Sequence, residues 1–357
     1  MSKGITLVDA FPFFNEETLL RARLAYLGEL NYPIIHVAGE GNFTHSGIPK
    51  EYKIDQILHM ETLSLKEHQS FQVLKINLSE YQDAWSREIA TRELILKEVK
   101  SRYHPCKIIL SDLDEFPSLN QVRKFLQSPE LCEFSFPIRN YFRRVNWRTG
   151  NDVSPHNGLF LSSYCESLPN AGRYENFPNI GTECELGKHF SYLHVSPNQF
   201  KEKAMGTAET YVFRNQITRT ENYINYCDRY KINHLGRITR KGFGLLSVER
   251  SLDGLQKVVA EFFPKWHDTS SNPPLARRLW AAAKVSVIQH NAPFFRRASD
   301  DQLAREFSEF YFGIPGQYSF SWSSKLLKSK FYWRMIGLIV YQLYCACIEG
   351  LRRSVKK

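Results

Sequence analysis

Three acidic side chains, Asp112, Asp114 and Glu115, lie within four positions of the segment KIILSDLDEFPSL. They follow a short apolar run that is typical of a buried strand, and Pro117 prevents either a strand or a helix from simply continuing. Carboxylates held this close repel one another, so one pKa rises unless a positive charge compensates. Hard oxygen ligands in a D-x-D pattern suit Mn²⁺ or Mg²⁺, with substrate phosphates completing the shell. The pattern predicts metal ligands at Asp112 and Asp114, although acidic turns after strands are also common.

The elements that position these acids are predicted from the alternation of apolar runs and amphipathic stretches. Because strands alternate with helices, we expect an α/β fold with a mostly parallel central sheet. Ligands of such sheets gather beyond the carboxyl ends of the strands. Asp9 and Glu40 end two predicted strands, so we expect them beside the acidic cluster. The predicted strands are 5–8, 33–37, 71–76 and 107–110, and the predicted helices are 15–27 and 85–102.

The second half of the chain is expected to be less regular. From about residue 134 to 211, aromatic, Asn, Gly and Pro residues interleave without long periodicity, which favours the loop-rich half of a binding cleft. The stretch TSSNPPL is typical of a linker, and helices are predicted after it at 275–289 and 299–312. We therefore divide the chain into a catalytic domain, residues 1–267, and a C-terminal helical region, residues 268–357.

The composition limits the partners and the compartment. The formal net charge of +10 favours anionic partners, but no basic and aromatic signature of a nucleic-acid module is present, so no nucleic-acid partner is expected. Seven scattered cysteines without zinc spacing indicate reduced thiols. No long apolar run follows the basic residue near the N-terminus, as a secretory signal would require. The expected location is the cytoplasm.

The C-terminal tail has a different character. Met335 to Ile348 is strongly apolar but shorter than the about 20 residues that cross a bilayer. Lysine and arginine side chains lie on both sides of it. The tail is either a terminal helix packed in the core or an interfacial helix on anionic lipid. The second alternative would place the protein peripherally on the inner face of the membrane.

Four segments carry a combination of motifs in a fixed order. Together they resemble glycosyltransferase family 17, which includes the β-1,4-mannosyl-glycoprotein β-1,4-N-acetylglucosaminyltransferases. The resemblance covers residues 8 to about 211 and implies a GT-A-type nucleotide-sugar-binding fold. The first segment, VDAFPFFNEETLLRARL, is similar to the family's opening motif, and the second, WSREIATRE, is similar to its W-x-R-E-x-x-x-R helix. The third, ILSDLDEFP, is similar to its S-D-x-D-E-x-P signature. The fourth, LGKHFSYL, is similar to its later G-W-H-x-S segment, and Lys203 and Glu209 follow it as the lysine and glutamate of the family.

The resemblance also implies roles for individual residues. His189 would be the third metal ligand beside the two aspartates, with a hydrogen-bonded structural histidine as the alternative. Lys188 stands where the family has a tryptophan, so the substrate identity depends on this position. Asn15 and Glu115 could instead cap helices. Arg87 and Arg92 could pair with Glu88, with the acidic cluster or with the diphosphate, or they could lie on a solvated helix face. The residues expected to bind the nucleotide-sugar donor are Asp9, Asn15, Glu16, Glu40, Arg87, Arg92, Glu115 and Lys188.

An inverting transfer needs a general base that takes the proton of the acceptor hydroxyl. Glu209 is the first choice because the family match reaches it, followed by Glu183 and Glu185. His194 and Glu175 remain open as alternatives.

The sequence as a whole therefore predicts a metal-dependent, inverting glycosyltransferase. By family analogy it would move N-acetylglucosamine from UDP-GlcNAc to a glycan acceptor, for which a lipid-linked polysaccharide precursor is a candidate. The alternatives are the same fold with another donor sugar, a metal-dependent phosphohydrolase or nucleotidyltransferase, and a non-catalytic carbohydrate-binding protein.

Overall fold

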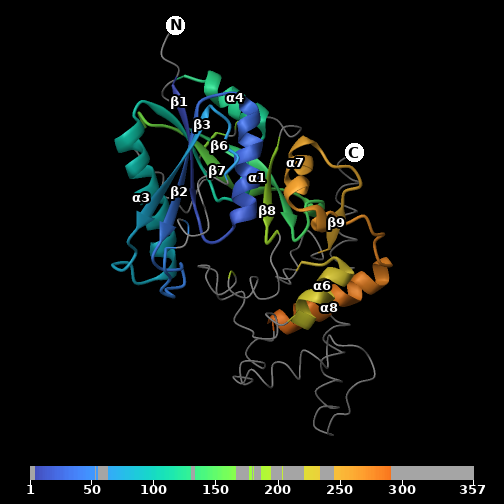
Figure 1. Ribbon diagram of the computed structural model, residues 1–357. Coiled ribbons are helices and arrows are strands. Elements are labelled where there is room, and N and C mark those ends of the chain that lie inside the picture. The colour runs from blue at the N-terminus through green and yellow to red at the C-terminus, as the bar shows by residue number, and fades with distance from the viewer. Residues whose placement is uncertain are drawn as a thin grey trace.

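A mixed β-sheet with helices on its faces organises the described part of the chain (Figure 1). The computed structural model describes residues 5–52, 54, 63–129, 133–165, 177–178, 180, 186–193, 203, 221–233 and 245–290. Within these residues, nine strands join in the order β3-β2-β1-β4-β7-β6-β8-β5, and β9 pairs with β7. The α/β class is therefore as the sequence predicts.

The first half of the sheet is parallel. Its strands are β1 (Thr6–Pro12), β2 (Ile34–Gly41), β3 (Gln69–Ile76) and β4 (Cys106–Leu110). Two helices, α1 (Glu17–Leu27) and α3 (Ala84–Tyr103), cover its opposite faces (Figure 1). Alternate side chains of one strand explain this arrangement, because Leu7 and Phe11 pack in the cluster that includes α1, whereas Val8 and Ala10 pack in the cluster that includes α3.

The second half of the sheet is mostly antiparallel, so the expected mostly parallel sheet is correct only for the first half. The strand β7 (Trp147–Ser162) runs antiparallel to β4, and β6 (Glu133–Phe142) runs antiparallel to β7. The prediction of a loop-rich region is therefore wrong for residues 134–142 and 147–162. The pairing of β6 with β7 shifts register twice, which interrupts the side-chain alternation that identifies a strand in a sequence.

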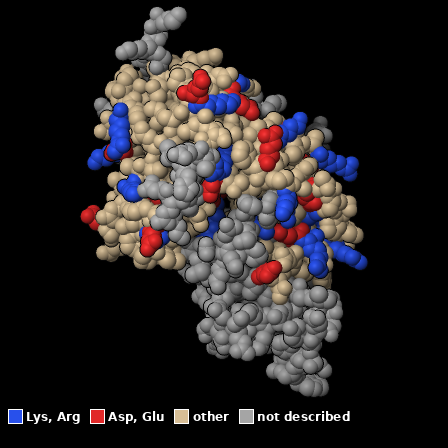
Figure 2. All heavy atoms as spheres, viewed as in Figure 1, with Lys and Arg blue, Asp and Glu red and all other residues tan. Residues whose placement is uncertain are grey.

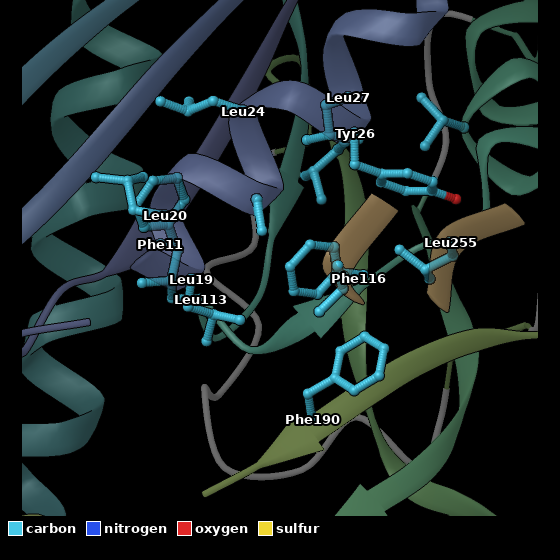
Figure 3. Close-up of a cluster of buried hydrophobic side chains, with 14 of the residues drawn as sticks. Phe11, Leu19, Leu20, Leu24, Tyr26, Leu27, Leu113, Phe116, Phe190 and Leu255 are labelled. Atoms are coloured by element: carbon cyan, nitrogen blue, oxygen red, sulfur yellow. The ribbon is translucent and has the colours of Figure 1, made fainter. Parts of the chain in front are cut away.

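Short strands and helices complete the fold. The helix α7 (Gly254–Phe262) contacts α1, and Figure 3 shows Leu255 of α7 close to Tyr26 of α1 and to Phe116. These side chains belong to one buried apolar cluster. The remaining elements are η1 (Gly28–Leu30), β5 (Glu115–Phe116), α4 (Leu119–Gln127), β8 (Gly187–Ser191), α6 (Glu221–Tyr230), β9 (Leu246–Val248), α7 (Gly254–Phe262), η6 (Pro264–Trp266) and α8 (Leu275–His290).

Contacts cross the predicted domain boundary between residues 267 and 268. Asp268 accepts a hydrogen bond from the indole of Trp147 at 2.7 Å. Arg278 of α8 donates to the carbonyls of Tyr230 and Lys231 at 3.1 and 3.0 Å. The helix predicted at 275–289 is confirmed, while residues 291–357, with the helix predicted at 299–312 and the apolar tail, lie outside the described residues. The division into domains stays a prediction.

Two observations concern the surface and the membrane. On the face shown in Figure 2, the acidic and basic side chains of the described residues are interspersed and do not gather into one basic patch. None of the helices that the structure describes is both long and apolar enough to cross a membrane.

Candidate functional site

The acidic segment, Ser111–Glu115, follows β4 directly and lies at the end of the parallel half of the sheet. Its last residue begins β5, which pairs antiparallel with β8. In that register Glu115 is opposite His189, although 74 positions separate them in the sequence. The sheet therefore places the predicted histidine beside the predicted aspartates, and the pairing of β5 with β8 is the element that does so.

Asp114 is the centre of a row of alternating charges. Its Oδ1 lies 3.4 Å from Nε2 of His189, and its Oδ2 lies 3.2 Å from Nζ of Lys203. The same ammonium group lies 2.6 Å from Oε1 of Glu16, which precedes α1. Four side chains from distant parts of the sequence thus meet at one point.

These contacts shift the ionisation of the cluster. Burial would raise the pKa of Asp114, but Lys203 and His189 together hold that pKa below its ordinary value. Burial would lower the pKa of His189, yet the carboxylate of Asp114 raises the pKa of this ring to about 9. Burial and the neighbouring Asp112 raise the pKa of Glu115 to about 7. The cluster at neutral pH therefore combines an ionised Asp114 with a protonated His189.

Asp112 has its own basic partner. Its Oδ1 accepts a hydrogen bond of 2.6 Å from Nη2 of Arg92, and its side chain is 41% exposed. The other terminal nitrogen of Arg92 donates to Oε1 of Glu88 at 2.8 Å. The backbone N–H of Asp112 donates to Oε2 of Glu115 at 3.1 Å. Of the alternatives for Arg92, pairing with both Glu88 and the acidic segment is the one observed.

The arrangement does not fit a metal ion as the sequence predicts it. The donors are of the right chemical type, since carboxylate oxygens and imidazole nitrogens bind Mn²⁺. However, Arg92 occupies an oxygen of Asp112, and both oxygens of Asp114 face cationic groups. Within the described residues, no group of three His, Cys, Asp or Glu side chains is arranged to hold an ion.

Comparisons with known proteins add little to this geometry. No protein-family model matches the sequence, and no curated protein matches it either. The crystal structure of HddC from Yersinia pseudotuberculosis is similar at 11% identity, over 58% of this chain and 99% of that chain, with a TM-score of 0.30. A similarity at this level carries no argument about fold or function. The resemblance to family 17 accordingly stays a prediction.

Asp9 is not where the strand pattern places it. The strand β1 continues to Pro12, so Asp9 lies inside the sheet rather than at the end of a strand. Its side chain is fully buried and contacts Arg23 at 2.7 Å and His36 at 2.9 Å. Burial would raise the pKa of Asp9, but these two partners lower it to about 2. The expected contact of Asp9 with a donor does not fit this position.

Glu40 and Lys188 also point to structural partners. Oε2 of the buried Glu40 accepts a hydrogen bond of 3.0 Å from the N–H of Ile54. Nζ of Lys188 donates to the hydroxyl of Tyr141 at 3.0 Å and lies 2.8 Å from Oδ2 of Asp253, the N-cap residue of α7. Lys188 therefore fastens β8 to the start of α7, and its ammonium group does not join the Asp114 cluster.

Three further predictions concern residues near helix ends. Asn15 is exposed and does not cap α1, because the N-cap position is Glu16 and no side chain caps that helix. Ser118 caps α4, which leaves Glu115 free of the capping role considered for it. Arg87 donates to the carbonyls of His45 and Gln82 at 2.9 and 2.8 Å, so it holds a loop rather than the acidic segment.

The predicted general bases cannot be placed. Glu209, Glu183 and Glu185 lie outside the described residues, as do the alternatives Glu175 and His194. Their roles stay predictions.

Sequence reasoning missed Arg23, a fully buried side chain that makes several hydrogen bonds near the site. A signal was available, because Arg23 shares the helical spacing of Leu19, Leu20 and Leu27 on the buried side of α1. An arginine on an apolar helix face requires a buried partner, and Asp9 is that partner.

Proposed function

We propose that the chain is a glycosyltransferase that binds a nucleotide sugar at the acidic segment. The observation that carries the proposal is the meeting of Glu16, Asp114, His189 and Lys203 beyond the end of β4. In an α/β sheet this edge is where ligands bind, and the family resemblance suggests UDP-GlcNAc as the donor. Charged groups of both signs suit a ligand that carries a diphosphate and sugar hydroxyls.

The proposed reaction is an inverting transfer. The acceptor hydroxyl attacks the anomeric carbon of N-acetylglucosamine, and the bond between that carbon and the diphosphate oxygen breaks with its electron pair on the diphosphate. A carboxylate takes the hydroxyl proton, with Glu209 as the first choice. Lys203, His189 and Arg92 are the cations of the site that would balance the charge of the departing UDP.

The acceptor and the setting are proposed from the sequence. A glycan is the acceptor class, with a lipid-linked polysaccharide precursor as the specific candidate. The cytoplasmic face of a membrane is the proposed setting, through the C-terminal tail.

The first experiment measures the melting temperature with a panel of nucleotide sugars, each with Mn²⁺, with Mg²⁺ and with EDTA. UDP-GlcNAc is expected to stabilise selectively, by about 2.7 kcal/mol at a ligand concentration of about 100 times Kd. The EDTA samples separate a need for a divalent cation from binding by the chain's own cations.

Substitutions connect the binding to the site. Asp114→Asn should abolish both the stabilisation and the transfer of sugar, because Lys203 and His189 lose their shared partner. Glu98→Gln is the matched control, since Glu98 forms a partly exposed ion pair with Arg102 on α3. If Asp112→Asn and Asp114→Asn both keep wild-type binding and transfer, the assigned site is wrong. Release of phosphate or the joining of nucleotides without a sugar acceptor would favour the hydrolase or nucleotidyltransferase alternative, and sugar binding without turnover the non-catalytic one.

A further inference from the structure

The buried guanidinium group of Arg23 forms hydrogen bonds to the acidic segment. Its side chain is fully buried, and its Nη1 donates to three carbonyls of that segment: Asp112 at 3.1 Å, Leu113 at 3.3 Å and Glu115 at 2.7 Å. Its Nη2 donates to the hydroxyl of Ser111 at 2.8 Å. One guanidinium group therefore contacts four of the five residues of the segment.

The other side of the guanidinium is fixed to the sheet. Nε of Arg23 lies 3.0 Å from Oδ2 of Asp9, and Nη2 lies 2.7 Å from Oδ1 of the same carboxylate. The ring of Phe11 lies 5.2 Å and that of Phe116 5.6 Å from the guanidinium carbon. All the donor nitrogens of Arg23 are used, and the planar fork allows only one orientation.

We propose that Arg23 is a positioning residue for the acidic segment. By donating hydrogen bonds to the carbonyls of the segment, it fixes the positions of the Asp112 and Asp114 side chains relative to His189 and Lys203. The consequence for sugar transfer rests on the proposed function, whereas the consequence for the order of the segment does not.

The chemistry explains why arginine is needed. A lysine would keep the positive charge beside Asp9, but its ammonium group has three donors on a flexible stem and no planar fork. It cannot contact the carboxylate, the hydroxyl and three carbonyls together. The hydroxyl of Ser111 supports the same geometry, because it lies 3.3 Å from the carbonyl oxygen of Asp112 and 3.2 Å from that of Glu115.

The test compares Arg23→Lys with Arg278→Lys in the full chain. Arg278 is a matched control because it is also buried and also donates to three backbone carbonyls, which belong to Tyr230, Lys231 and Leu246. Amide hydrogen exchange of the acidic segment is the direct measurement. Arg23→Lys is expected to accelerate exchange there, and Arg278→Lys is not.

Kinetics with UDP-GlcNAc provide the second measurement. A displacement of about 1 Å in a catalytic group can cost about 100-fold in rate, so kcat of Arg23→Lys should fall by that order with KM for the acceptor little changed. Ser111→Ala, which keeps the Cβ atom, replaces Arg23→Lys if that variant does not fold, and should give a smaller change in the same direction.

The outcomes are distinguishable. If Arg23→Lys lowers the melting temperature as Arg278→Lys does, while exchange of the segment and kcat match the control, Arg23 is only structural and the inference is wrong. If exchange accelerates but the wild-type protein transfers no sugar, the proposed function fails and the positioning of the segment stands.

Discussion

At the residue scale, the buried charges around Asp9 are balanced by contacts from three elements. Asp9 of β1 is paired in register with His36 of β2, and Arg23 reaches it from α1. Gln69 of β3 lies 3.0 Å from Nε2 of His36, and its amide nitrogen also donates to the carbonyl of Leu24. Because the amide nitrogen can only donate, the hydrogen-bond network assigns the proton of His36 to Nδ1, where it faces Asp9. Arg23 and His36 thus both contact the carboxylate of Asp9, and both lower its pKa.

A pH-dependent stability follows from this balance. The pKa of Asp9 is about 2 in the folded chain, against 3.8 for an unperturbed aspartate. A group whose folded pKa is depressed stabilises the fold above its unfolded pKa and loses that contribution as the pH falls through the folded value. The free energy of unfolding should therefore decrease as the pH falls from about 4 to about 2, by on the order of 2 kcal/mol from this residue. Urea unfolding across that range measures it.

Asp9→Asn isolates the contribution. At neutral pH the variant should lose about 3–5 kcal/mol, because Arg23 stays buried without its counter-ion. The variant should also lose part of the dependence on acid pH. Glu17→Gln is the control, since the exposed pair of Glu17 with Arg21 contributes about 1 kcal/mol or less. An Asp9→Asn variant with wild-type stability would contradict the assigned ion pair.

The same residues show what sequence reasoning can and cannot reach at this scale. The sequence identified Asp114, His189 and Glu16 as candidate site residues, and the structure brings these three side chains together around Lys203. The pairing of Arg92 with the acidic segment was one of the alternatives that the sequence left open. The contact of Lys203 with Asp114 was not predicted, because 89 positions separate the two residues. The end of the first strand was placed at Asp9 because an acid usually leaves a buried strand. Arg23, which lies 14 positions later, pairs with Asp9 and so offsets the free-energy cost of burying the carboxylate inside the sheet.

At the element scale, the position of His189 depends on a close approach of three strands. Gly187 of β8 pairs with Ile138 of β6, and the neighbouring Lys188 pairs with Phe116 of β5. A Cβ atom on Gly187 would lie 2.4 Å from the carbonyl oxygen of Phe116 and 2.9 Å from Cγ2 of Ile138. The first neighbour is backbone, which cannot rotate away. Only glycine allows β8 to enter between β5 and β6.

Gly187→Ala should therefore move β8 away from β5. We expect a loss of about 1–3 kcal/mol in the free energy of unfolding, as for other overpacked sites. The stabilisation by UDP-GlcNAc should also decrease, because the contact between His189 and Asp114 depends on the same pairing. Gly254→Ala is the control, since no atom lies within 4 Å of the added Cβ and the residue begins α7. That variant should be neutral or gain up to about 1 kcal/mol. Equal stability of the two variants would contradict the argument.

The strands of the parallel half of the sheet could be predicted from the sequence, whereas β6 and β7 could not. The parallel strands β1, β2 and β4 contain short apolar runs, whereas β3 alternates between polar and apolar residues, and both patterns are visible in the sequence. The helix predicted at 85–102 was found at Ala84–Tyr103. By contrast, β6 and β7 find their partners across the sheet, and their register shifts disturb the alternation. Long-range pairing with bulges leaves little local pattern to read.

At the scale of the whole molecule, the C-terminal part of the described chain is not a separate layer. Val259 of α7 belongs to the same buried cluster as Leu20 of α1. Asp268 lies 2.7 Å from Nζ of Lys231, and its pKa falls to about 2 because Lys231, Ser270 and Trp147 outweigh the effect of burial. The described residues of α7 and of the segment before α8 therefore share the core or the polar contacts of the sheet.

The sequence leaves two alternatives open for the C-terminal tail, a helix packed in the core or an interfacial helix on anionic lipid, and an experiment can distinguish them. If residues 331–357 form an interfacial helix, the full chain should float with vesicles that contain anionic lipid and not with neutral vesicles. Each basic residue near such a surface contributes about 1 kcal/mol, and the attraction is screened within about 10 Å at 0.1 M salt. Deleting Phe331–Lys357 should abolish flotation and leave the melting temperature unchanged. If the tail packs in the core, the deletion lowers the melting temperature instead.

A variant without the last basic residues separates the electrostatic from the hydrophobic contribution to vesicle binding. Replacing Arg352, Arg353, Lys356 and Lys357 by glutamine keeps the apolar stretch from Met335 to Ile348 and removes the basic residues after it. Since a short apolar helix alone binds weakly, the variant should need a lower salt concentration for the same vesicle binding. Sugar transfer to a water-soluble acceptor should be unaffected, because such an acceptor does not require the lipid surface. Flotation equal to that of the wild-type chain at every salt concentration would show that the basic residues do not hold the protein at the lipid surface.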